Sequence, residues 1–166
     1  MSKAPSFSAE LLGLLEENPL RSPEALAKLL DCEPAAVGEE IARLEREKVI
    51  LGYKAIVDDE KAQRRTVKAV IEVKVVPERG GGFDRLARRI ARYPEVTSCF
   101  LMSGGYDLLV FLEGSTLQNI ALFVSEKLAT LRGVTSTATH FMLRTYKEQG
   151  VLVGDSPNPE RLPVSP

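Results

Sequence analysis

A short glycine-rich segment between two apolar stretches carries the residues best suited to hold a small charged molecule. Gly104, Gly105, Tyr106 and Asp107 follow one another at a predicted hairpin turn. Glycine permits positive φ angles and a close approach of a ligand to backbone N–H groups. Such donors suit a carboxylate, and the Asp107 side chain can pair with an ammonium group. A second interpretation stays open, in which residues 103–105 are only a tight turn and Asp107 is a surface or helix-pairing acid.

The residue types that usually carry metal or redox chemistry are scarce in this chain. It holds two cysteines, Cys32 and Cys99, and one histidine, His140. Two cysteines outside a CxxC pair make neither a disulfide framework nor a zinc site, and one histidine excludes a multi-histidine metal centre within one chain. We therefore expect no catalytic residue, no metal and no cofactor.

Composition indicates a globular protein with an uneven distribution of charge. The 166 residues are 44% hydrophobic and 27% charged, and no apolar run approaches the roughly 20 residues of a membrane span. The N-terminus lacks the apolar core of a secretory signal, so we expect a cytoplasmic protein with no membrane partner. Residues 1–57 carry seven basic and ten acidic groups, a net charge of −3, whereas residues 66–150 carry eleven and eight, a net charge of +3.

The first fifty residues predict three short helices. Ser8 is a candidate cap for the first helix, which ends before Pro19 because the residue preceding a proline is driven out of the helical conformation. Ser22 with a following proline begins the second helix. The third runs from Pro34 to about residue 48, with apolar residues at i, i+4 and i+7. The tight break before it is typical of a helix-turn-helix.

The second half of the chain alternates between strand and helix patterns. Residues 67–76 place apolar side chains at every second position, as in a half-buried strand. A helix is expected at 83–93, strands at 96–102 and 106–112, a helix at 116–131 and a last strand at 134–146. The order βαββαβ predicts a ferredoxin-like sheet with both helices on one face. The other face is left uncovered and apolar, which favours a homodimer.

Together these patterns predict an α+β protein with an N-terminal helix-turn-helix domain, winged-helix-like in type, and a C-terminal ferredoxin-like βαββαβ domain. We place the helix-turn-helix domain at residues 1–52 and an extended linker at 53–65, where apolar residues become rare. The ferredoxin-like domain follows at 66–150. Prolines, serines and acids then indicate a flexible tail at 151–166.

Several short motifs in a fixed order carry a family resemblance. They are Val-Ile-Leu-Gly-Tyr at 49–53, Pro-Glu-Val at 94–96, Gly-Tyr-Asp at 105–107, Gly-Val at 133–134 and Thr-Ala-Thr at 137–139. Each is weak alone, but their order and spacing make the match specific. From about residue 7 to 148, the sequence resembles the Lrp/AsnC ("feast/famine") transcriptional regulators.

The resemblance implies a regulator that responds to a metabolite, typically an amino acid, and binds double-stranded DNA through its helix-turn-helix. It also implies a homodimer formed through the C-terminal domain, with octamers or higher assemblies in some members. Effectors of the family sit at subunit interfaces near the Gly-Tyr-Asp hairpin. The effector contacts so implied are Gly104, Gly105, Tyr106, Asp107, Thr137 and Thr139.

The expected recognition helix departs from the family's pattern. Family members usually carry polar or basic residues where Gly38, Glu39 and Glu40 stand, and two adjacent carboxylates repel phosphates. Arg43 and Arg46 can pair with glutamates three or four residues away instead of binding DNA. Because such helices use their N-terminal side chains on bases and their flanks on phosphates, the candidate DNA contacts are Arg21, Ala35, Ala36, Glu39, Glu40, Arg43, Arg46 and Lys54.

Two other functions stay open on the sequence alone. The acidic recognition helix favours a sensor or adaptor subunit with weak or no DNA binding, which acts through hetero-oligomerisation. The same two-domain architecture also resembles sirohaem decarboxylases. Those enzymes rely on several histidines around a tetrapyrrole, and the single His140 argues against this alternative.

Overall fold

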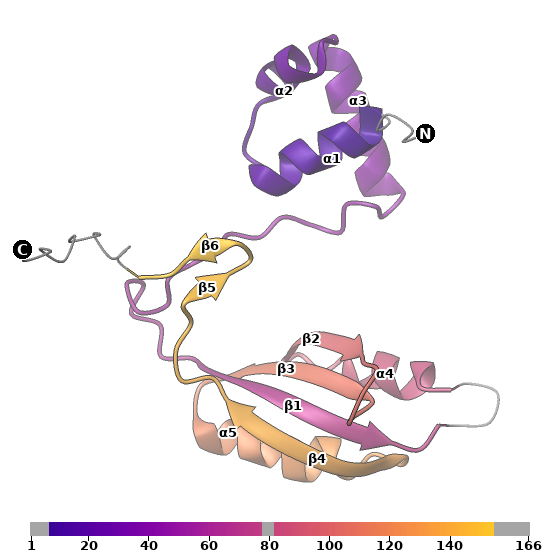
Figure 1. The fold of residues 1–166 in the computed structure, drawn as a ribbon, viewed down its shortest axis with the longest axis vertical. Coiled ribbons are helices and arrows are strands. Elements are labelled where there is room, and N and C mark those ends of the chain that lie inside the picture. Colours follow the sequence, from indigo (N-terminus) through magenta and orange to yellow (C-terminus); the bar gives the residue numbers. More distant parts are fainter. Residues whose placement is uncertain (1–6, 78–81, 155–166) are drawn as a thin grey trace, which may run out of the picture. The chain divides into compact units, whose positions relative to one another are not determined.

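The computed structural model describes residues 7–77 and 82–154, and the chain forms two compact units (Figure 1). The division falls between Ala55 and Ile56, within the segment expected to be a linker. Each unit has its own hydrophobic core. No described helix is long and apolar enough to cross a membrane.

The first unit holds three helices, which confirms the predicted helix-turn-helix. Leu11, Leu26, Val37 and Leu44 form its core and are almost completely buried. Between residues 7 and 66 the structure describes no strand, so residues 51–57 are an exposed extended segment instead of a paired wing. The helices are α1 (Phe7–Glu17), α2 (Pro23–Leu30) and α3 (Pro34–Arg46).

Local chemistry explains where α2 begins, but not where α1 begins. The Ser22 hydroxyl caps α2 by accepting a hydrogen bond from the Ala25 N–H at 3.3 Å, as predicted. The expectation that Ser8 caps α1 is wrong, because α1 already begins at Phe7 and Ser8 lies within its first turn. The Ser8 hydroxyl instead donates to the Glu40 carboxylate of α3 at 2.6 Å.

The second unit is a four-stranded antiparallel sheet with helices, and the ferredoxin-like prediction is confirmed. Its strand order is β2-β3-β1-β4, so the two central strands are the first and third in the chain. The elements are β1 (Val67–Val75), α4 (Asp84–Ile90), β2 (Val96–Leu101), β3 (Leu108–Gly114), α5 (Leu117–Leu122), the π-helix η1 (Phe123–Leu128) and β4 (Val134–Phe141).

The chain after β4 differs from the expected single long strand. Strand β4 ends at Phe141, and a separate two-stranded hairpin follows, formed by β5 (Lys147–Glu148) and β6 (Val151–Leu152). Gln149 and Gly150 turn this hairpin with φ angles of 44° and 87°. The segment expected to be a flexible tail therefore begins with a paired strand, and residues 155–166 of that tail lie outside the described residues.

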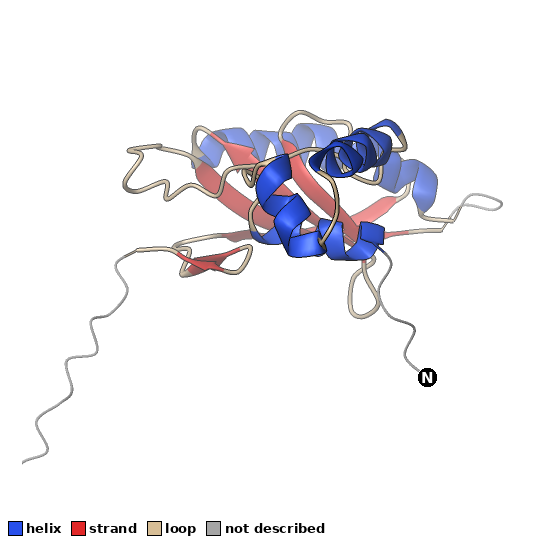
Figure 2. Ribbon diagram, turned by 90° about the horizontal axis from the view of Figure 1, so that it is seen from above, coloured by secondary structure: helices blue, strands red, loops and turns tan. Residues whose placement is uncertain are grey.

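The two faces of the sheet have different surroundings. Ala69, Ile71 and Val73 of β1 are fully buried and share one core with Ile90 of α4 and Ile120 of α5. Both helices therefore cover the same face, and they lie on one side of the red strands in Figure 2.

Among the described residues of this unit, no helix packs on the opposite face. By the strand register it holds Val70, Leu109 and Phe111 together with Phe100, whose side chain is 51% exposed. The rings of Phe100 and Phe111 meet edge to face with centroids 6.0 Å apart. The sheet thus presents an apolar area to its surroundings, and beside it on the same face His140 Nε2 lies 3.4 Å from Glu72 Oε1.

Candidate functional site

Helix α3 turns one face into the core and leaves the other exposed. Val37 and Leu44 are buried, whereas Ala35, Ala36 and Glu39 are exposed. Within the described residues the Glu39 carboxylate makes no hydrogen bond or ion pair. The N-terminal half of α3 therefore presents small side chains and one free carboxylate.

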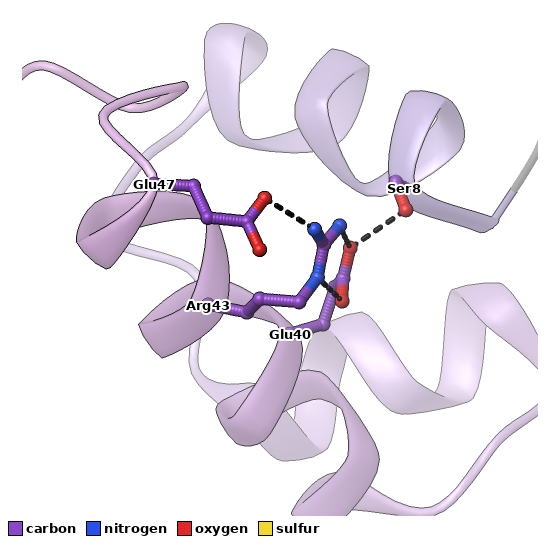
Figure 3. A network of polar contacts seen from close by, with 4 residues as sticks. All are labelled: Ser8, Glu40, Arg43 and Glu47. Atoms are coloured by element: carbon purple, nitrogen blue, oxygen red, sulfur yellow. Dashed lines mark hydrogen bonds and ion pairs between the residues drawn. The ribbon is translucent and has the colours of Figure 1, made fainter.

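The neighbouring Glu40 belongs to a four-residue polar network (Figure 3). Arg43 donates from Nε to Glu40 Oε2 at 2.8 Å and from Nη2 to Glu40 Oε1 at 2.7 Å. Its Nη1 reaches Glu47 Oε2 at 2.5 Å, and the Ser8 hydroxyl donates to Glu40 from α1. Every group in the network has a partner, and the network joins α1 to α3.

Charge-assisted hydrogen bonds in this network favour the ionised forms of its members. The bonds from Arg43, and then that from Ser8, lower the pKa of Glu40 from 4.5 to about 2. The bonds to Glu40 and Glu47 raise the pKa of Arg43. Arg43 is thus engaged within its own helix, the alternative that its spacing from nearby glutamates indicated.

The other candidate cations differ in how far they are engaged. Arg21 donates from Nη1 to the Leu14 carbonyl at 3.3 Å and from Nη2 to Glu17 at 3.0 Å. It is therefore bonded to the C-terminal turn of α1. Arg46 and Lys54 are exposed, and neither side chain has a hydrogen bond or ion pair in the part of the chain that the structure describes. These two remain the uncommitted cations among the candidate DNA contacts.

Asp107 stands directly before β3 and is bonded to the backbone of β1. Its Oδ2 accepts from the Val75 N–H at 2.8 Å, and its own N–H donates to the Val73 carbonyl at 3.0 Å. The pairing of β1 with β4 shifts register between Lys74 and Val75. The half-buried Asp107 carboxylate therefore supplies an acceptor at this irregularity.

The rest of the hairpin is open. Gly104 and Gly105 are exposed, Gly104 has a φ of +147°, and a Cβ at either position would meet nothing within 4 Å. Tyr106 is half-buried. The Met102 N–H closes the hairpin by donating to the Asp107 carbonyl at 2.8 Å.

The two threonines reach this region to different degrees. On β4, Thr137 pairs with Val73 and Thr139 pairs with Ile71, which places both on the helix-covered face of the sheet. Asp107 and Thr137 thus flank β1 at the same level, since both neighbour Val73, whereas Thr139 lies further along the strand. The structure groups residues 104–107 closely and Thr137 more loosely.

Two cavities of the sheet unit lie away from this hairpin. One of about 170 Å³ is lined by the segment before β1 and the segment after β4, and Lys68 pairs there with Asp59 at 2.7 Å. The other, of about 230 Å³, lies between the end of β3 and α5. None of residues 104–107 lines either cavity, and the described residues hold no group of three side chains suited to a metal ion.

Comparisons with known proteins match both parts of the chain. The family model of the Lrp/AsnC ligand binding domain matches residues 68–152. The uncharacterized HTH-type transcriptional regulator YugG of Bacillus subtilis is 44% identical over 158 residues, which cover 95% of each chain. The leucine-responsive regulatory protein of Haemophilus influenzae is 26% identical over 148 residues, 89% of each chain.

A solved structure supports the same fold. A transcriptional regulator of Neisseria meningitidis in complex with L-Met aligns with a TM-score of 0.68 at 22% identity, covering 90% of this chain and 96% of that one. Fold and matches together define a helix-turn-helix transcriptional regulator with a separate ligand-binding domain. The chain belongs to the Lrp/AsnC family. Its relatives are regulators and not enzymes, so the decarboxylase alternative is excluded.

Proposed function

We propose that this regulator responds to an amino acid and binds double-stranded DNA through α2 and α3. One observation supports the proposal: the same chain contains a helix-turn-helix, in which one face of α3 is exposed, and a ligand-binding sheet domain. Two relatives are named for amino acids, one as leucine-responsive and one as an L-Met complex. An α-amino acid is accordingly the class of effector that we propose.

We propose that the effector binds at residues 104–107. One Asp107 oxygen accepts from Val75, so the other is available to an ammonium group, and the open backbone at Gly104 and Gly105 offers N–H groups to a carboxylate. Thr137 and Thr139 are the more distant proposed contacts. Because the hairpin is exposed in a single chain, we propose that a second copy completes the site.

A thermal-shift screen of the common amino acids tests the effector site. A ligand at a hundredfold excess over its Kd stabilises the fold by about 2.7 kcal/mol, so at least one amino acid should raise the melting temperature. Asp107→Asn should abolish that shift, because the asparagine keeps an oxygen for the Val75 N–H but loses the charge that pairs with an ammonium. A shift that survives both Asp107→Asn and Gly105→Val would place the effector elsewhere.

A second function is favoured by the polar network on α3. With Arg43 held by Glu40 and Glu47 and Arg21 held by Glu17, Arg46 and Lys54 are the candidate DNA contacts of basic type that have no partner among the described residues. Phosphate contacts supply most non-specific affinity. An adaptor that acts through hetero-oligomerisation is the alternative. Capture of fragmented genomic DNA at low salt, with and without an amino-acid mixture, separates the two. Selective capture that changes with the mixture supports the regulator, and capture of no fragment supports the adaptor.

A further inference from the structure

The exposed side of α3 carries a specific pattern of side chains. Residues 35, 39, 42 and 46 recur at four- and three-residue spacing, so they form one stripe along the helix, and the structure leaves all four exposed. Glu39 and Arg46 are the charged members. They stand seven residues apart, about 10 Å along the helix axis, and neither has a partner among the described residues.

The two adjacent glutamates have separate tasks. The Glu40 side chain is 14% exposed and receives hydrogen bonds from Arg43 and Ser8. Its oxygens are therefore committed to holding α1 and α3 together. Glu39, one residue earlier and turned by about 100° around the helix, carries a free acceptor on the exposed stripe.

Alanines surround Glu39 on this side of the helix. Ala35, Ala36 and Ala42 are exposed, and their small side chains allow the helix backbone to come close to the base edges. A carboxylate in the major groove accepts from the N4 amino group of cytosine, and an alanine methyl can contact the thymine methyl. The same carboxylate repels phosphates, so its contribution is to selectivity and not to general affinity.

We propose that Glu39 reads the DNA directly and selects cytosine at one position of the site that α3 contacts. The inference rests on the proposed DNA binding through α3. Glu40 has no part in this selection and acts as a positioning residue that fixes α3 against α1. Arg46, at the far end of the stripe, provides a cation for the phosphate backbone.

Selection of bound sequences from a random duplex library, carried out with the full-length wild type and three variants, tests the inference. The wild type should enrich sites with cytosine at one position, and Glu39→Ala should lose the preference at that position alone. On a matched pair of duplexes that differ only there, we expect about a tenfold preference for cytosine in the wild type and none in Glu39→Ala. Glu39→Gln should shift the preference toward adenine, which a glutamine amide can bind.

Glu40→Gln is the matched control, because it removes the neighbouring charge from the same helix. It should keep the cytosine preference even if the protein becomes less stable. Cytosine selection that survives Glu39→Ala, or that disappears only in Glu40→Gln, would overturn the inference while leaving DNA binding intact. A wild type that enriches no sequence and captures no genomic fragment would instead overturn the proposed function, and this inference with it.

Discussion

Asp107 serves the fold of the sheet as well as the proposed effector site. Its Oδ2 satisfies the Val75 N–H at the point where the register of β1 shifts. A buried donor without a partner is costly, so this bond contributes to stability whether or not a ligand is present. A substitution at position 107 therefore reports on two roles, and the choice of substituent decides which one is measured.

Asp107→Ala should lower the free energy of unfolding of the ligand-free protein by about 1–3 kcal/mol, the cost of leaving the Val75 N–H without an acceptor. Asp107→Asn should lower it by less, because an amide oxygen can take the place of the carboxylate oxygen. Urea denaturation without amino acids measures both. Equal stability of the alanine variant and the wild type would show that the bond to Val75 contributes nothing.

Glu40 makes the stability of the helical unit depend on pH. Because its folded-state pKa of about 2 lies below its ordinary value of 4.5, ionised Glu40 favours the folded state. That contribution is complete above about pH 4.5 and is lost as the pH falls toward 2. Glu40→Gln should therefore be less stable than the wild type at neutral pH, and the difference should shrink in acid. Denaturation curves from pH 6 to pH 2.5 test this, and a constant difference would contradict it.

The spacing of charged residues predicted part of this chemistry, and long-range contacts account for the rest. The pairing of Arg43 with Glu40 and Glu47 was foreseeable from three- and four-residue spacing on one helix. The bond from Ser8 to Glu40 and that from Val75 to Asp107 each join residues 32 positions apart. No local pattern indicates such contacts, so the sequence predicts Ser8 as a helix cap and Asp107 as a ligand contact or a surface or helix-pairing acid.

At the scale of elements, the alternation of apolar residues in strands and their three- and four-residue spacing in helices predicted the order of the elements. The residues at which the elements begin and end depended on tertiary contacts. The alternating residues of β1 are buried as expected. Strand β3 begins at Leu108, two residues later than predicted, and Asp107, directly before it, bonds to the backbone of β1 through its side chain. The β5–β6 hairpin was missed, since its strands are only two residues long and such short runs leave no periodic signal.

Two glycines with equally open surroundings should respond to alanine in opposite ways. Gly38 lies inside α3, and a Cβ there would meet nothing within 4 Å. Gly38→Ala should therefore raise the free energy of unfolding by up to about 1 kcal/mol, the difference in helix propensity. Gly104 has the same open space but a φ of +147°, which an alanine side chain disfavours, so Gly104→Ala should destabilise the sheet unit.

Circular dichroism during thermal or urea unfolding measures both effects. Because Gly38 and Gly104 lie in different units and both units contain helices, each variant is compared with the wild type under the same conditions. A loss of stability in Gly38→Ala would mean that α3 needs conformational freedom at this position. An unchanged Gly104→Ala would mean that the hairpin relaxes without cost.

For the whole molecule, the uncovered face of the sheet favours self-association. Helices α4 and α5 cover one face, and the other presents Val70, Phe100, Leu109 and Phe111. Exposed apolar areas of this kind mark interaction surfaces, and a second copy of the same chain supplies a face of matching chemistry. We propose that the protein is at least a dimer through this face, and that octamers or larger assemblies can build on that dimer.

Phe111→Asp should convert the assembly to a monomer at micromolar concentration. The substitution places a charge in the middle of the apolar face, where burial against a partner would require its desolvation. In the monomer the aspartate stays hydrated, so the variant should fold, as a wild-type-like circular dichroism spectrum would show. Light scattering of the full-length protein gives the mass.

Leu20→Asp is the matched control, because Leu20 is 92% exposed and lies in the helical unit. This variant should have the same mass in solution as the wild type. A wild type that is a stable monomer, or a Phe111→Asp variant that keeps the wild-type mass, would show that this face is not the interface.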